Sequence, residues 1–194
     1  MEQLTETEWE KFHQMVEAVG PSSFFEDSSG IVFRGGTGPY TIDYVRKPYR
    51  DALKSQSLLD EDPEFFEDTG IHTIFLLAKS VEMHMRLFYL GGKKEDFENK
   101  SFTLSKCAQA VRNGEAQFTG FRGKKVEAKG AFWANFRPED KRRHPLVTLA
   151  FKIYDAGNPY RHNMVSPWVD VSPKFKKIIS NFERFIEIFD EMVE

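Results

Sequence analysis

The sequence contains a single cysteine, Cys107, among its 194 residues. One cysteine excludes a disulfide framework within the chain and a zinc site with four cysteine ligands, and it is typical of a reducing compartment. Apolar runs such as residues 74–77 are far shorter than the roughly 20 residues of a membrane span. The N-terminus is acidic and lacks the basic and apolar regions of a signal peptide. These absences predict a soluble, intracellular and cytoplasmic protein without a membrane partner.

Several motifs of enzymes and nucleotide-binding proteins are also missing. Residues 35–38 are rich in glycine but lack the Gly-Lys-Ser/Thr ending of a phosphate-binding loop, so we interpret them as a turn. The five histidines are scattered and give no Ser-His-Asp arrangement. Cys107 lacks the surroundings of a nucleophile and is predicted to lie in the core. We therefore expect no cofactor and favour a non-enzymatic function.

The length and the hydrophobic pattern predict one α+β domain spanning residues 1–194. Amphipathic helices are predicted near the two termini, at residues 5–19 and 172–194, and shorter helices at 48–59 and 102–111. Between the end helices we expect seven or eight strands that form a mainly antiparallel sheet. The predicted strands are residues 31–34, 40–45, 71–80, 81–88, 116–121, 126–137, 146–154 and 164–171, of which 71–88 form one bent strand or two.

The predicted C-terminal helix has an unusual distribution of charge. Ser172 is its expected N-cap and Pro173 its first residue. Lysines lie in its first turn and acidic residues in its last turn, the reverse of what the helix dipole favours. One interpretation is that the acidic end competes with nucleic acid or docks a protein partner. The other is that this side of the helix is simply solvated.

Charge is segregated along the chain. Residues 1–70 contain 6 basic and 15 acidic side chains, whereas residues 91–160 contain 14 basic and 8 acidic side chains. The second segment therefore has a net charge of +6 although the whole chain has −3. Such segregation predicts a positive surface formed by the second half of the sequence.

The candidate binding site lies in two predicted strands of this basic segment and in the loop between them. On one face of strand 126–137, Trp133 alternates with Lys129 and Arg137. Rings that stack with bases and cations that contact phosphates are the combination that single-stranded nucleic acid requires. We therefore predict a sequence-tolerant, single-stranded DNA- or RNA-binding protein. The predicted contact residues are Lys129, Trp133, Arg137, Lys141, Arg142, Arg143, Lys152 and Tyr154.

Other interpretations of the same residues remain open. Trp133 and Tyr154 belong to the core if a helix covers this face of the sheet. The many phenylalanines also suit a protein-interaction or assembly module that buries an aromatic surface. Glu127 and Lys129 match half of a metal-dependent nuclease motif, and a strand bearing Glu82 and His84 suggests a metal site with residue 155 or 162. The oligomeric state and the choice between DNA and RNA are left open.

Overall fold

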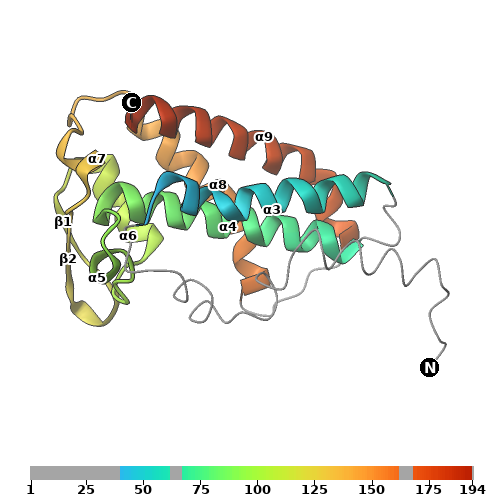
Figure 1. Ribbon diagram of the computed structural model, residues 1–194, viewed down its shortest axis with the longest axis horizontal. Helices are drawn as coiled ribbons and strands as arrows, with labels where there is room; N and C mark the ends of the chain where they lie inside the picture. The colour runs from blue at the N-terminus through green and yellow to red at the C-terminus, as the bar shows by residue number, and fades with distance from the viewer. Residues whose placement is uncertain (1–39, 62–66, 162–167, 194) are drawn as a thin grey trace.

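The computed structural model describes residues 40–61, 67–161 and 168–193, which are mainly helical (Figure 1). The predicted α+β fold with seven or eight strands is therefore wrong, since the described residues contain seven α-helices and one two-stranded antiparallel sheet. The helices are α3 (Ile42–Glu61), α4 (Glu67–Leu90), α5 (Lys94–Phe97), α6 (Leu104–Asn113), α7 (Ala131–Ala134), α8 (Arg143–Arg161) and α9 (Trp168–Val193). The strands are β1 (Gln117–Thr119) and β2 (Lys125–Glu127).

Helix α4 is the central element, because α3, α6, α7, α8 and α9 all pack against it. Its side chains are buried on almost every side, including Ile74, Leu77, Val81, Met85 and Phe88. A helix surrounded in this way loses the polar face that produces a helical period. Residues 71–88 were consequently predicted as one or two buried strands, which is wrong.

Helix α8 packs closely against α4 through a glycine. A Cβ atom at Gly157 would overlap the Cβ of Ala78 and lie 3.1 Å from the Ile74 carbonyl oxygen. The buried residues of α8 include Leu146, Ala150, Ile153 and Gly157, whose spacing of three and four is helical. The predicted strand at residues 146–154 is therefore wrong. Apolar and other residues alternate in this part of the sequence, but the side chains that are buried do not follow that alternation.

Helix α9 confirms the predicted C-terminal helix, whose phenylalanines lie in the core of the molecule itself. It begins at Trp168, so Ser172 is not its N-cap and the predicted strand is wrong over residues 168–171. Helices α3 and α6 confirm the helices predicted at 48–59 and 102–111. Helix α3 begins at Ile42, so the strand predicted at 40–45 is wrong. The helix predicted at 5–19 and the strand predicted at 31–34 lie outside the described residues.

A short antiparallel hairpin replaces the predicted meander. Strands β1 and β2 pair in the register Phe118 with Val126, and the chain turns between them. The predicted strand 126–137 ends at Glu127, however, because Gly130 closes against α4. Its N–H donates to the Tyr89 carbonyl at 2.9 Å, and a Cβ at this position would overlap the Phe88 carbonyl oxygen.

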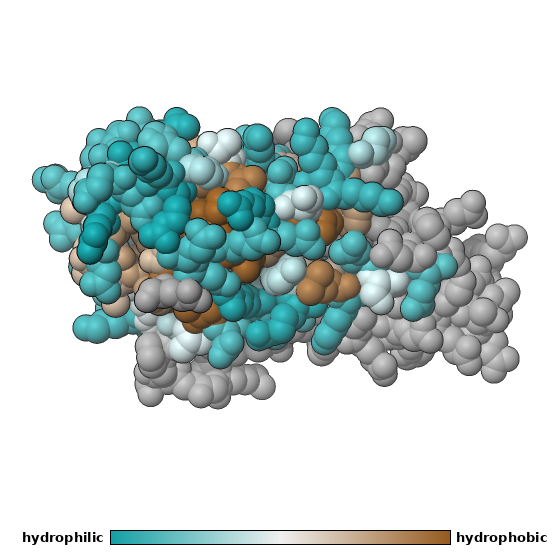
Figure 2. All heavy atoms as spheres, turned by 90° about the horizontal axis from the view of Figure 1, so that it is seen from above, coloured by the Kyte–Doolittle hydropathy of each residue, from teal (hydrophilic) through white to brown (hydrophobic). Residues whose placement is uncertain are grey.

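The hairpin, α5, α6 and α7 gather at one end of the bundle formed by the long helices, on the left in Figure 1. These elements belong to the basic segment of the sequence. Hydrophilic side chains cover the same end when the molecule is viewed from above (Figure 2). Among the described residues, no helix combines the length and the apolar character that a membrane span requires.

Candidate nucleic-acid interface

The predicted contact residues do not form one face of a sheet. Lys129 follows β2 and Trp133 lies in α7, while Lys152 and Tyr154 lie on α8. Arg137 and Lys141 are exposed in the connection between α7 and α8, and Arg142 and Arg143 are partly buried at its end. The hairpin predicted to carry these residues is therefore absent, although their contact with nucleic acid stays a prediction.

Trp133 packs against the core and is not a free stacking platform. Its ring is stacked on Phe136 with a centroid separation of 4.9 Å, and it lies 4.9 Å from Tyr89 and 6.1 Å from Phe88. Tyr154 is likewise partly buried against the main core. Neither ring is therefore presented to the solvent as a stacking platform for bases.

Two of the predicted cations are held by carboxylates. The ammonium group of Lys129 lies 2.7 Å from Asp96 Oδ1. The guanidinium of Arg142 donates to both oxygens of Asp140, at 2.6–3.1 Å, and lowers the pKa of that carboxyl group. These pairs neutralise much of the positive charge that the sequence suggested at the two positions.

Arg142 also explains how the reversed charge of α9 is tolerated. Its guanidinium donates to the main-chain carbonyl of Glu191, within the last turn of α9. Arg46 of α3 forms an ion pair with Asp190 in the same turn. Cations at a helix C-terminus are favourable, so distant elements supply the charge that α9 itself lacks. A protein partner at this acidic end stays a prediction.

An exposed aromatic ring lies at the tip of the hairpin. Phe121 is 57% exposed, and among the residues whose side chains the structure describes, the only other exposed large apolar side chain is that of Leu53 on α3, at 41%. The guanidinium of Arg122 lies 5.3 Å from the centroid of the Phe121 ring. Lys124 and Lys125 follow and are exposed. The hairpin tip thus combines one ring with three cations.

The backbone of this tip has an uncommon conformation. Arg122 and Gly123 both have positive φ angles, of 56° and 71°. A left-handed residue other than glycine costs roughly 1–2 kcal/mol. The pattern Phe-Arg-Gly-Lys-Lys was visible in the sequence, but residue 121 was assigned to a strand end and its exposure could not be recognised.

Main-chain contacts fix the backbone that carries the Phe121 side chain. The N–H of Phe121 donates to the Ser101 carbonyl at 2.8 Å, and the N–H of Gly120 donates to the Lys124 carbonyl at 2.8 Å. A Cβ atom at Gly120 would overlap the Ser101 carbonyl oxygen, so glycine permits this close approach. The hairpin tip is therefore anchored to the segment between α5 and α6.

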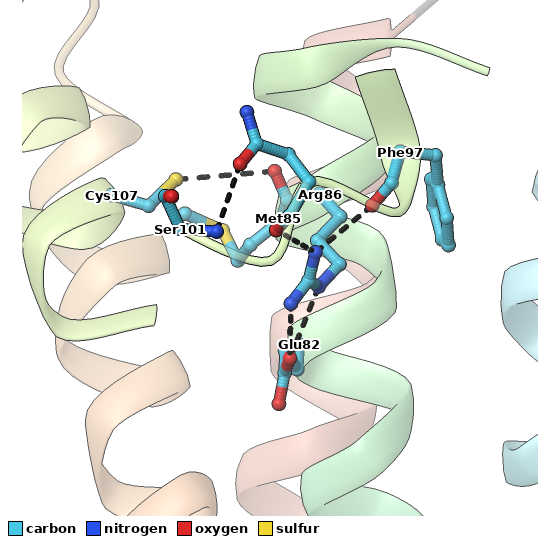
Figure 3. Close-up of polar contacts among 7 residues, drawn as sticks. Glu82, Met85, Arg86, Phe97, Ser101 and Cys107 are labelled. Atoms are coloured by element: carbon cyan, nitrogen blue, oxygen red, sulfur yellow. Dashed lines mark hydrogen bonds and ion pairs between the residues drawn. The ribbon is translucent and has the colours of Figure 1, made fainter. Parts of the chain in front are cut away.

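Arg86 of α4 holds that segment in turn (Figure 3). Its Nη1 donates to the carbonyls of Phe97 and Asn99 at 2.9 and 3.2 Å, and its Nε donates to Glu82 at 3.0 Å. The side chain of Asn99 accepts a hydrogen bond from the Ser101 N–H at 2.9 Å. A continuous set of hydrogen bonds therefore links the central helix to the hairpin tip.

Cys107 lies beside this support (Figure 3) and confirms the prediction of a core position. Its thiol is fully buried, and burial raises its pKa well above the ordinary value. The neutral thiol that results is a poor nucleophile. This residue therefore contributes to packing and not to the chemistry of the site.

Two surface cavities flank helix α6. One, of about 400 Å³, lies between α6 and the hairpin, and the other, of about 380 Å³, lies between α6 and α8. We call them together the α6 groove. The first is lined by Lys106, Gln109, Ala110, Asn113, Glu115, Gln117, Phe118, Thr119 and Lys125. The second is lined by Ser105, Lys106, Gln109, Arg112, Asn113, Val147 and Phe151.

The α6 groove is electropositive. Lys106, Arg112 and Lys125 line it, and none of them has an ion-pair partner within the part of the chain that the structure describes. Its one lining carboxylate, Glu115, accepts a hydrogen bond from the Asn113 side chain at 3.0 Å. These cations are therefore available to an external anion, in contrast to Lys129 and Arg142.

The residues considered as metal ligands are engaged otherwise. Glu82 pairs with Arg86, and the His84 side chain is fully buried on α4 rather than on a strand. Residue 162 lies outside the described ranges. Within residues 40–61, 67–161 and 168–193, no three carboxylate, histidine or cysteine side chains gather as a metal site would require.

Comparison with protein-family models, with curated proteins and with solved structures gives no match for this chain. The hairpin tip and the α6 groove remain the features of the described residues that suit the binding of an external anion.

Proposed function

We propose that the protein binds single-stranded nucleic acid, with the β1–β2 hairpin as its stacking platform. The observation that carries this proposal is the exposed Phe121 ring, which lies on a backbone anchored by hydrogen bonds, contacts the Arg122 guanidinium and is followed in the sequence by the exposed Lys124 and Lys125. A base stacks on such a ring with about 1–3 kcal/mol, and neighbouring cations contact the phosphates.

The proposal keeps the ligand predicted from the sequence but moves its main contact. Trp133, Lys129 and Arg142 are engaged within the protein. Arg137 and Lys141 remain exposed beside α7, and Lys152 remains exposed on α8. In this proposal these three cations supply electrostatic attraction around the site, since positive surface charge accelerates the association of anionic ligands.

Replacing the exposed ring tests the proposal. We expect Phe121→Ala to weaken binding of a labelled single-stranded oligonucleotide of about 12 nucleotides by about 5- to 150-fold. This range corresponds to the loss of about 1–3 kcal/mol of stacking. Fluorescence anisotropy at low salt provides the dissociation constants.

Leu53→Ala is the matched control, because Leu53 is the other exposed large apolar side chain and lies on α3. We expect this variant to bind like the unmodified protein. Equal affinities of the Phe121→Ala variant and the unmodified protein, or the absence of binding by both, would rule out the hairpin as a stacking platform.

A further inference from the structure

The first cavity of the α6 groove reaches strand β1, next to the hairpin tip. Thr119 and Gln117 line the cavity between α6 and the hairpin, and Phe121 follows Thr119 by two residues. Two residues of an extended strand span about 7 Å. A ligand that contacts the Phe121 ring therefore lies close to the first of the two cavities.

The lining of the groove suits a nucleotide chain. Lys106 and Arg112 project from exposed positions of α6, and Lys125 lies across the first cavity on β2. The carboxamides of Gln109, Asn113 and Gln117 supply both hydrogen-bond donors and acceptors. Ala110 and Phe118 provide apolar surface in the first cavity, as Val147 and Phe151 do in the second.

We propose that the α6 groove is the path along which a single strand continues from the Phe121 ring, across α6 toward α8. This inference rests on the proposed function and extends it from a stacking platform to a binding site of several nucleotides. Lys125, Lys106 and Arg112 contact successive phosphates, while the carboxamides between them hydrogen-bond to the bases.

The same cations would also attract an acidic peptide, but two observations favour a nucleotide chain. Phe121 offers an exposed π face at one end of the path, and a base stacks on it whereas a carboxylate side chain does not. The edges of bases carry both hydrogen-bond donors and acceptors, as the carboxamides along the groove do. The carboxylate side chains of an acidic peptide carry acceptors only.

The test compares oligonucleotides of about 4 and about 12 nucleotides, lengths that bracket common site sizes. The groove variant is Lys106→Ala/Arg112→Ala. Its matched control is Lys174→Ala/Lys177→Ala, which also removes two cations but lies in the first half of α9, at the end of the molecule away from the hairpin (Figure 1). Anisotropy is measured over a range of salt concentrations.

We expect the longer oligonucleotide to bind the unmodified protein more tightly than the shorter one. The groove variant loses most of this difference while its affinity for the shorter oligonucleotide stays nearly unchanged. For the longer oligonucleotide, the slope of log affinity against log salt becomes shallower by about 1.4, since each phosphate contact contributes about 0.7. The control variant retains the affinities and the slope of the unmodified protein.

Two results would overturn the groove assignment. If the groove and control variants lose equal affinity, the groove acts only through overall charge. If polyglutamate displaces the longer oligonucleotide as effectively as an unlabelled copy does, the groove is a site for acidic peptides. Failure of the stacking proposal looks different, because Phe121→Ala would then bind both oligonucleotides normally while the groove variant still weakened the longer one.

Discussion

At the scale of single residues, His84 is a fully buried titratable group with polar contacts of its own. Its Nδ1 lies 2.7 Å from the Ser80 carbonyl, which identifies this nitrogen as the protonated donor, and its Nε2 has no hydrogen-bond partner among the residues that the structure describes. The rings of Phe185 and Phe189 meet it edge-on. Burial, and to a lesser degree the charge of Arg46, lowers the pKa of His84 to about 4.

This burial predicts that stability depends on pH. His72 also has its pKa lowered to about 4, mainly by burial. Between about pH 6.5 and 4 the unfolded chain binds protons at these histidines and the folded chain does not. Stability is therefore complete above about pH 6.5 and falls as the pH decreases, by up to about 1.4 kcal/mol per pH unit for each histidine.

Urea unfolding at pH 7 and pH 5 measures this effect. We expect a lower unfolding midpoint at pH 5, and a smaller difference between the two pH values in His84→Gln, because one titrating group has been removed. Arg46, whose charge contributes to the lowered pKa of His84, forms an ion pair with Asp190. A midpoint in the unmodified protein that is the same at both pH values would contradict the account.

At the scale of elements, the close crossing of α4 and α8 depends on Gly157. We expect Gly157→Ala to destabilise the protein by about 1–3 kcal/mol, because the new methyl group overlaps Ala78 in a packed core. The effect runs against helix propensity, which favours alanine over glycine by about 1 kcal/mol. Thermal or urea unfolding provides the change in free energy.

Two further variants make this prediction specific. Asp155→Ala changes an exposed residue of the same helix and should alter stability by no more than about 0.5 kcal/mol. Adding Ala78→Gly to Gly157→Ala should restore part of the lost stability, since it removes the overlapping Cβ. Destabilisation by Asp155→Ala equal to that by Gly157→Ala would show that the crossing is not under steric constraint.

The elements also differ in how much of the fold the sequence could predict. Helix α9 was recognised because one of its faces is buried and the other is polar, so its period is preserved. Helix α4 was missed because its neighbours cover it on nearly all sides. Its length was the better signal, since residues 71–88 exceed the usual length of a strand.

Only part of the candidate site could be predicted from the sequence, because its geometry depends on contacts between distant residues. The basic hairpin predicted from strands 126–137 and 146–154 is absent, and the hairpin that forms instead pairs residues 117–119 with residues 125–127. The Asp96 partner of Lys129 and the Glu191 carbonyl that Arg142 contacts could not be foreseen, because they are 33 and 49 residues away in the sequence, whereas Asp140 lies only two residues before Arg142. The exposure of Phe121 likewise depends on how Ser101 anchors the hairpin.

At the scale of the whole molecule, the residues that form the core differ from those of the proposed binding surface. The phenylalanines of α9 fill the core with α4, so this apolar row is not free to bind another protein. The cations without internal partners in the α6 groove lie beside the hairpin, at the end opposite the start of α9 (Figure 1). In the proposed function, the bundle supports one basic, aromatic surface at this end.

The most direct test of this account is a nuclear magnetic resonance titration of the full chain with a single-stranded oligonucleotide of about 12 nucleotides. We predict that the largest changes in amide chemical shift occur at the hairpin, residues 117–127, and along α6, with little change in α3 and the first half of α9. Changes concentrated on α3 or α9, with the hairpin and α6 unaffected, would contradict the central claim.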